Sequence, residues 1–268
     1  MQALRHFLLA VQFFTRIPIT GRLADWVGFS PAMLRASSAH FPGVGWVVAA
    51  AATASYGALA LLLAPSPWAS AVAAVGCTVV TVLLTGGFHE DGLADVADGL
   101  GGSADTERAL DIMKDSRIGA YGTLALVLAL LAKVALLALL GSHSLAAALT
   151  ALAGAHVLSR LWPLCIVRSL PHVGDTARSK SKPLADQISP GALVAAFLWC
   201  FPALALVQQA PAALFLGAGI VVSMVAAWRM QRLFARRLGG FTGDCLGATQ
   251  QVGEIAFYLG AALTLGAL

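Results

Sequence analysis

Charged residues are scarce in this sequence: they make up 11% of its 268 positions, whereas 59% are hydrophobic. Soluble domains contain about 25% charged and about 45–50% apolar residues. The longest polar intervals between the apolar runs span about 20–30 residues, which is too short for a separate soluble domain. The composition therefore excludes an ordinary soluble protein and predicts one membrane-embedded domain, residues 1–268.

Clustered cysteines are also lacking. The four cysteines lie in or beside apolar runs, and no two of them have CxxC spacing, so we expect neither a zinc site nor a disulfide framework. The net charge is +4, but the basic residues are distributed over several loops, so we expect no nucleic-acid binding. No internal repeat and no signal-peptide cleavage site are visible.

The apolar runs predict an all-α fold. A hydrocarbon core of about 30 Å requires about 20 apolar residues per helix. Seven runs approach this length: residues 41–64, 69–87, 119–141, 145–168, 191–208, 211–228 and 252–268. We therefore expect a polytopic integral membrane helix bundle of about seven transmembrane helices. Residues 6–18 are apolar but too short to span, and they predict an additional interfacial or re-entrant helix.

Charged residues are distributed unequally between the two ends of these runs. Three turns, at residues 65–68, 142–144 and 209–211, contain no Lys, Arg, Asp or Glu. Basic residues cluster instead in the N-terminal segment and in three other loops. With seven spans these four regions share one face, which the positive-inside rule makes cytoplasmic. We therefore expect a multi-pass protein of the cell (inner) membrane.

The most informative segment runs from His89 to Gly99 and begins where an apolar run ends. It contains four carboxylates: Glu90, Asp91, Asp95 and Asp98. Because successive helix residues turn by about 100°, the three aspartates fall within about 60° of arc. Such crowded like charges favour a bound cation, and hard oxygen ligands suit Mg²⁺, Mn²⁺ or Ca²⁺ rather than Zn²⁺. The segment predicts a divalent-metal site at the cytoplasmic surface; a polar capping loop is the alternative interpretation.

Residues 105–119 predict a short amphipathic helix in which Asp111 and Asp115 are one turn apart, together with Lys114 and Arg117. Carboxylates that hold a metal, next to cations that neutralise phosphate oxygens, suit a polyanionic substrate such as a pyrophosphate. A solvated helix with ion pairs between successive turns is the alternative.

The last polar loop, residues 239–254, is rich in glycine, which lets backbone amides approach a phosphate closely. Asp244 in this loop could supply a metal ligand or a base. Glu254 lies near the start of the last apolar run, and we expect it to have a buried partner.

Two basic residues lie inside apolar runs. We expect Arg160 to reach toward the cytoplasmic cavity and Lys133 to extend toward the outer surface. The loop at residues 178–183 is either a topology anchor or a strap that grips phosphate, and the sequence does not separate these readings.

Together these motifs resemble the cobalamin synthase family, the adenosylcobinamide-GDP ribazoletransferases. Four segments carry the resemblance: QFFTRIP at 12–18, GFHEDGLADVADG at 87–99, DIMKDSRIGAYG at 111–122 and GDCLGA at 243–248. They cover almost the whole length of the chain.

The resemblance implies a Mg²⁺-dependent membrane enzyme that joins adenosylcobinamide-GDP to α-ribazole or its 5′-phosphate. The products would be adenosylcobalamin or its 5′-phosphate, and GMP. A ribazole hydroxyl would attack the phosphoryl group attached to cobinamide, and GMP would leave. The lipid bilayer is then a partner, and both a homo-oligomer and a complex with other cobalamin assembly enzymes stay open.

The resemblance also implies roles for individual residues. The expected metal ligands are Glu90, Asp91, Asp95 and Asp98. The expected catalytic residues are Asp95, Asp115 and His89. The residues expected to contact substrate phosphates are Lys114, Arg117, Arg160 and Asp244.

Two other functions stay open at this point. A CDP-alcohol phosphotransferase carries the signature D-x-x-D-G-x-x-A-R, and residues 95–103 contain its opening but lack the Ala-Arg. A cation transporter would use the carboxylates for permeation. Transporters bind their ions near the bilayer midplane, whereas this cluster is predicted at a membrane edge.

Overall fold

The chain is described by a computed structural model, which covers residues 1–173, 188–205 and 210–267. These residues form helices and no strand. The helices are α1 (Gln2–Phe14), α2 (Gly21–Val27), α3 (Pro31–Ser37), η1 (Ser38–His40), α4 (Phe41–Leu62), α5 (Ala69–Thr85), α6 (Phe88–Gly102), α7 (Thr106–Met113), α8 (Ala120–His143), α9 (Leu145–Leu158), α10 (Trp162–Ser169), α12 (Pro190–Ala205), α13 (Ala210–Arg237), α14 (Gly243–Ala262) and η2 (Leu265–Ala267). The predicted all-α fold is confirmed.

Four helical segments of the described chain have the length and hydropathy to cross a membrane: Pro31–Leu62, Ala120–His143, Leu145–Ser169 and Ala213–Arg237. Helices α5 and α6 pass the same test only as a pair, which is bent by 89°, so the pair adds at most a fifth span. The polytopic membrane bundle is confirmed, but the predicted number of seven spans is not.

Two of the predicted runs explain much of the difference. The run at 191–208 extends into residues that the structure does not describe. The run at 252–268 belongs to α14, which contains buried polar residues such as Gln250, Gln251 and Glu254. Such a helix is surrounded by protein rather than by lipid, so its composition differs from that of a lipid-facing span.

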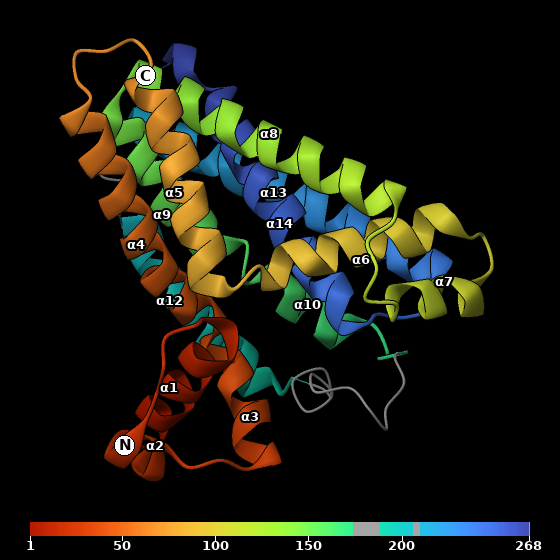
Figure 1. Ribbon diagram of the computed structural model, residues 1–268. Coiled ribbons are helices and arrows are strands. Elements are labelled where there is room, and N and C mark those ends of the chain that lie inside the picture. The colour runs from red at the N-terminus through yellow and green to blue at the C-terminus, as the bar shows by residue number, and fades with distance from the viewer. Residues whose placement is uncertain (174–187, 206–209, 268) are drawn as a thin grey trace.

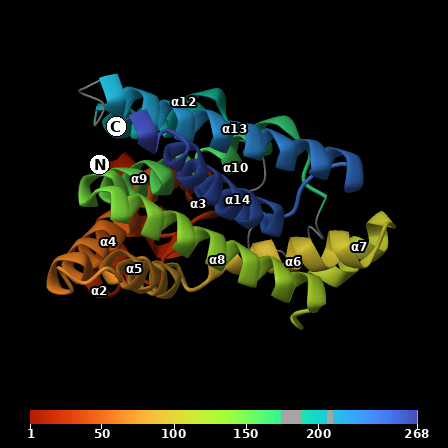
Figure 2. The same ribbon diagram turned by 90° about the horizontal axis from the view of Figure 1, so that it is seen from above.

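Helix α14 forms the centre of the bundle. It packs against α6, α8, α9, α10 and α13, and Figure 2 shows it between α8 and α13. The side chains of Phe257 and Tyr258 on this helix are completely buried. In contrast, α8 exposes Leu124, Leu128 and Leu131 on its outer surface. Large apolar side chains on an outer helix face are typical of contact with lipid.

The N-terminal helices α1, α2 and α3 form a group at one end of the molecule (Figure 1). The segment that follows α1 is joined to the end of α5, because the backbone N–H of Arg16 donates to the carbonyl of Leu84 at 2.6 Å. The chain then bends between α5 and α6 at Gly86 and Gly87, whose φ angles are +70° and +69°. Glycine is favoured in this left-handed region because it has no Cβ. The predicted N-terminal helix exists, and its position relative to the membrane stays a prediction.

Helices α4 and α9 approach each other closely at Gly45. A Cβ at this position would lie 2.5 Å from the carbonyl oxygen of His156 and 2.8 Å from the Cα of Val157. We therefore expect Gly45→Ala to destabilise the protein by about 1–3 kcal/mol, because the backbone of α9 would have to move. The free energy of unfolding in detergent, measured by denaturant titration, tests this expectation.

Gly57→Ala is the matched control on the same helix, since its nearest neighbour would be Leu149 Cδ2 at 3.9 Å. Alanine is favoured over glycine by about 0.5–1 kcal/mol inside a helix, so this variant should be neutral or more stable. Equal destabilisation of both variants would contradict the close approach at Gly45.

Candidate active site

The acidic segment forms helix α6, which continues through Gly92 and Gly99 without interruption. Asp91 is exposed and Asp95 is half-buried. The predicted stripe of aspartates on one helix is therefore present. It starts directly after the bend that separates α6 from the apolar helix α5.

The first turn of α14 brings a further carboxylate, Asp244, to this stripe. The two helices touch at Gly92, where a Cβ would lie 2.8 Å from the carbonyl oxygen of Asp244. The charges of Asp244 and Asp91 both act on Asp95. We refer to Asp91, Asp95 and Asp244 as the carboxylate cluster. It joins two segments that are about 150 residues apart in sequence and that carry separate motifs.

Local contacts hold Asp244 in place. The side chain of Thr242 caps α14 by accepting a hydrogen bond from the backbone N–H of Cys245 at 3.4 Å, and its hydroxyl lies 3.3 Å from Oδ2 of Asp244. Burial raises the pKa of the Asp244 carboxyl, and the charge of Asp91 acts in the same direction. Protonation of this carboxyl is therefore easier than that of an exposed aspartate.

Within the described part of the chain, no group of three or more His, Cys, Asp or Glu side chains is arranged so that it could hold a metal ion. The carboxylate cluster is thus an acidic surface between two helices and not a closed cage of ligands.

Asp98 lies on the same stripe but contacts another helix. Its Oδ2 accepts the backbone N–H of Gly119 at 2.7 Å, and its Oδ1 accepts that of Gly122 at 2.8 Å. Both N–H groups belong to the start of α8, so Asp98 satisfies donors that a helix end leaves free. Asp98 therefore joins α6 to α8, a contact that its spacing in the sequence did not indicate.

Glu90 and His89 lie on the side of α6 that faces the bundle interior. Gln251 of α14 donates to Oε1 of Glu90 at 3.0 Å. His89 is 2% exposed, and its ring stacks on Phe41 with centroids 5.8 Å apart and an angle of 10° between the planes. These two residues were predicted together with the aspartates, but helix geometry turns them away from the carboxylate cluster.

A buried group of polar side chains surrounds Glu254 in the middle of α14. Lys133 of α8 forms an ion pair with it, with Nζ 2.6 Å from Oε1. The hydroxyl of Tyr258 donates to Oε1 at 3.1 Å, and Gln250 donates to Oε2 at 2.8 Å. Nδ1 of His156 lies 3.5 Å from Oε2. The expected partner of Glu254 is found. The expectation that Lys133 extends outward is wrong, because the buried carboxylate attracts its charge inward.

Arg160 lies next to this group and is 2% exposed. It donates to the carbonyl of His156 at 2.7 Å, and its guanidinium is 5.7 Å from the centre of the Phe41 ring. Nε of Arg160 and Oε2 of Glu90 are buried and make no hydrogen bond to described residues. Both residues line a small polar cavity. A space with unpaired donors and acceptors is typical of sites for ordered water. The cavity that Arg160 reaches is thus lined mostly by buried side chains of the bundle.

The predicted helix at 105–119 ends earlier than expected, at Met113. Asp115 and Arg117 follow in an exposed loop, where they form an ion pair of 2.6 Å. Arg117 lowers the pKa of Asp115 to about 2 by hydrogen bonding and by its charge. Lys114 is also exposed and lies 3.8 Å from Asp111. The segment ends at Gly119, which Asp98 holds against α6, and therefore presents exposed charges beside that helix.

The sequence predicts that the loop at residues 178–183 either anchors the topology or binds phosphate. It lies outside the residues that the structure describes.

Two arginines at the ends of α6 were not singled out for this role in the sequence. Arg16 packs its guanidinium against Gly86, at the bend before the helix. Arg237 donates to the carbonyls of Leu100 and Ser103, at 3.2 and 2.6 Å, at the other end. A cation near the C-terminus of a helix compensates its exposed carbonyls. Since these contacts are long-range, neither follows from local sequence patterns.

Comparisons with known proteins identify the family. The family model described as cobalamin-5-phosphate synthase matches residues 6–262. Curated relatives named adenosylcobinamide-GDP ribazoletransferase include those of Polaromonas naphthalenivorans, at 61% identity over 99% of this chain and 100% of the relative, and of Albidiferax ferrireducens, at 61% over 98% and 99%. The relative from Leptothrix cholodnii is 46% identical over 96% of this chain and 94% of its own length.

The chain belongs to the cobalamin-5-phosphate synthase family.

Membership confirms the resemblance, and with it a transferase of cobalamin biosynthesis. All four segments that carried the resemblance fall within the matched residues. The relatives named above resemble this chain over nearly its whole length. The residues of the carboxylate cluster also lie within residues 6–262, the part matched by the family model. No solved structure matches the chain.

The ion pair between Lys133 and Glu254 permits a stability test in this family member. Lys133→Met leaves a buried carboxylate without its cation, and breaking a buried pair costs about 3–5 kcal/mol. We expect this loss in the free energy of unfolding in detergent. Lys133→Met combined with Glu254→Gln removes both charges and should recover most of the stability. If the two substitutions were simply additive, the pair would not be coupled as its geometry indicates.

Proposed function

We propose that this chain transfers the adenosylcobinamide phosphoryl group of adenosylcobinamide-GDP to a hydroxyl of α-ribazole, or of its 5′-phosphate, and releases GMP in a Mg²⁺-dependent reaction. The observation that carries the proposal is the convergence of Asp91, Asp95 and Asp244 at the contact between α6 and α14. It occurs in a chain that is 61% identical to proteins named for this transfer.

The donor set fits Mg²⁺. Its oxygens are hard ligands, and three neighbouring carboxylates repel one another unless a cation is present. Mg²⁺ is usually bound through one or two carboxylates together with water and substrate phosphates, not by a cage made of protein alone. An open acidic surface that accepts a metal together with a pyrophosphate agrees with this preference.

The reaction forms one P–O bond and breaks another. The ribazole hydroxyl oxygen joins the phosphorus attached to cobinamide, and the bond between that phosphorus and the GMP oxygen breaks. GMP leaves with the electron pair of the broken bond, and the hydroxyl proton passes to water. When bound, Mg²⁺ would neutralise charge on the pyrophosphate and on the leaving phosphate. The protein contributes mainly by holding the two substrates in line, as in other phosphoryl transfers.

We assign different roles to individual residues. One or two carboxylates of the cluster Asp91, Asp95 and Asp244 would hold the metal directly, together with water and the substrate phosphates. Lys114 and Arg117 lie in the exposed loop beside α6 and would supply positive charge to the phosphates. We do not assign Asp115 as the proton acceptor, because a carboxyl with a pKa of about 2 is a weak base at neutral pH.

The side chains on the inner face of α6 would position this helix. Glu90 is bonded to α14 through Gln251, and His89 is stacked on α4 through Phe41. Asp98 fixes the start of α8 in the same way. We propose that these contacts hold the acidic stripe in place, and that the charge of Arg160 in the small polar cavity balances Glu90.

The activity assay uses purified protein in nanodiscs with adenosylcobinamide-GDP and α-ribazole. We expect GMP and cobalamin to form in equal amounts with Mg²⁺ and not with EDTA. Asp95→Asn should lower kcat by about 100-fold or more, which is the usual loss when a group that stabilises transition-state charge is removed. Asp25→Asn, an exposed aspartate on α2, is the control and should retain full activity.

Absence of GMP formation by folded wild-type protein would falsify the proposed reaction. Full activity of Asp95→Asn, or activity in EDTA, would still support the transfer reaction. Either result would contradict the proposal that the carboxylate cluster binds a catalytic metal ion.

We also propose that the protein lies in the inner membrane of the cell and that its site faces the cytoplasm. The loops near α7 carry basic residues, and basic residues mark the cytoplasmic side. Glu107 is exposed on α7, so Glu107→Cys should react with a membrane-impermeant maleimide in inside-out vesicles and not in intact spheroplasts. Labelling in spheroplasts would reverse the assigned orientation.

A further inference from the structure

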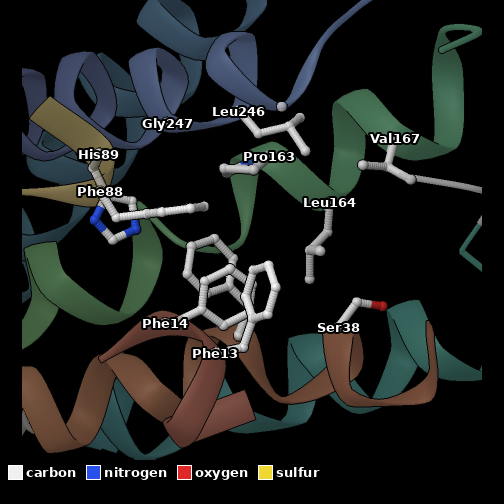
Figure 3. A pocket seen from close by; sticks show the side chains of 12 residues that line it. Phe13, Phe14, Ser38, Phe88, His89, Pro163, Leu164, Val167, Leu246 and Gly247 are labelled. Atoms are coloured by element: carbon white, nitrogen blue, oxygen red, sulfur yellow. The ribbon is translucent and has the colours of Figure 1, made fainter. Parts of the chain in front are cut away.

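Two interior cavities border the inner face of α6, and both are too small for a substrate. The polar cavity beside Arg160 has a volume of about 10 Å³, and an apolar pocket between α1, α4, α6, α10 and α14 has a volume of about 40 Å³ (Figure 3). The wall of the apolar pocket includes Phe13, Phe14, Phe41 and Phe88. A single water molecule requires about 10–15 Å³. Neither cavity therefore admits a ligand larger than a few water molecules.

The outer face of α13 changes from apolar to basic along its length. Val221, Val225 and Trp228 are 53%, 46% and 51% exposed, and Arg232 and Arg236 follow toward the C-terminal end. At about 100° per residue, these five positions lie within about 80° of arc. They form one continuous surface, which we call the α13 strip.

The α13 strip faces away from the rest of the bundle. Ser223, Ala227 and Phe234 lie on the opposite side of α13 and are buried. The hydroxyl of Ser223 donates to the carbonyl of Gly253 on α14 at 2.7 Å. Figure 2 shows α13 at one side of the molecule. The α13 strip is therefore turned away from α14, the helix that carries Asp244 of the carboxylate cluster.

The basic end of the α13 strip is organised around Trp228. The guanidinium carbons of Arg229 and Arg232 lie 5.8 and 5.7 Å from the centre of the Trp228 ring, which is within the range of cation–π attraction. Both arginines are exposed. No carboxylate of the described residues forms an ion pair with them or with Arg236. Positive charge is thus held in place here without a counter-charge from the described part of the protein.

The spacing along the helix matches the layers of a bilayer. Helix α13 belongs to the membrane-crossing segment Ala213–Arg237. Tryptophan is favoured at the boundary between the hydrocarbon core and the headgroups. Arg232 is four residues, or about 6 Å, beyond Trp228 along the helix axis, and the headgroup layer on each side of the core is about 5–8 Å thick. With Trp228 at the boundary, Arg229 and Arg232 reach the level of the lipid phosphates.

We propose that the α13 strip, together with Arg229, binds one anionic phospholipid. The lipid phosphate pairs with Arg229 and Arg232, and an acyl chain lies along Val221 and Val225. An anionic headgroup supplies the missing counter-charge. In phosphatidylcholine the ammonium group of the lipid already neutralises its phosphate, so a lipid with a net negative charge is favoured.

Other anions suit this surface less well. A nucleic acid or a free phosphate would leave the apolar part of the α13 strip uncovered, whereas an amphiphile covers both parts. The substrate pyrophosphate belongs at the carboxylate cluster, from which the α13 strip is turned away. The inference depends on the membrane class of the protein and not on the proposed reaction.

The test compares two lipids that differ in headgroup charge. Purified protein in detergent is titrated with dioleoylphosphatidylglycerol or with dioleoylphosphatidylcholine, and bound lipid is counted by native mass spectrometry. We expect Arg229→Gln combined with Arg232→Gln to weaken phosphatidylglycerol binding by about 10-fold or more, because two basic residues near the headgroup are lost. Phosphatidylcholine should bind more weakly, with the same affinity for wild type and variant.

The matched control removes the same charge elsewhere. Arg22 and Arg35 are exposed on α2 and α3, and Arg22→Gln combined with Arg35→Gln should bind phosphatidylglycerol within about 2-fold of the wild type. Arg229→Lys combined with Arg232→Lys keeps the charge and should retain most of the affinity. Thermal unfolding in detergent verifies that each variant is folded.

Equal affinity of the wild type for the two lipids would overturn the proposal, and so would an equal loss in the control. Unchanged phosphatidylglycerol binding in the folded glutamine variant would place the lipid elsewhere. Inorganic phosphate at millimolar concentration should not displace the lipid; displacement would instead assign a site for free phosphate. None of these assays uses the substrates of the proposed reaction, so they decide the lipid site even if the wild-type protein forms no GMP.

Discussion

The contact between α6 and α14 is the constraint on which the rest of the site depends. At Gly92 the helices approach so closely that a single methyl group would meet the backbone of Asp244. This approach places carboxylates from two distant segments beside one another in spite of their mutual repulsion. Packing of the surrounding helices must balance that repulsion, since like charges at short distance destabilise a fold unless a cation is bound.

The position of α6 is determined by contacts along its whole length. Arg16 packs at its first turn and Arg237 binds its last carbonyls. Between them, Gln251 holds Glu90, and Asp98 holds the start of α8. The helix is therefore attached to four other parts of the chain. The proposed phosphoryl transfer benefits from such rigidity, because its catalysis consists largely of positioning.

The interior of the bundle combines two environments on the inner face of α6. On one side, Lys133, His156 and Glu254 form a buried polar group around a small cavity. On the other side, aromatic side chains enclose the apolar pocket. His89 borders both. The acidic surface, the polar cavity and the aromatic pocket thus meet at one short helix, which accounts for the density of sequence motifs in that segment.

The sequence by itself determined the membrane class, the all-α fold, the family and the identity of the acidic helix, because hydrophobic run length and helical spacing are local properties. It also indicated that Glu254 needs a partner. Only the tertiary structure decided that Lys133 is this partner, that Asp98 caps α8, and that Asp244 joins Asp91 and Asp95. These outcomes depend on which helix faces meet, and that is set by close packing among residues far apart in the chain. The same holds for the number of spans, since a helix such as α14 can carry polar residues once other helices shield it from lipid.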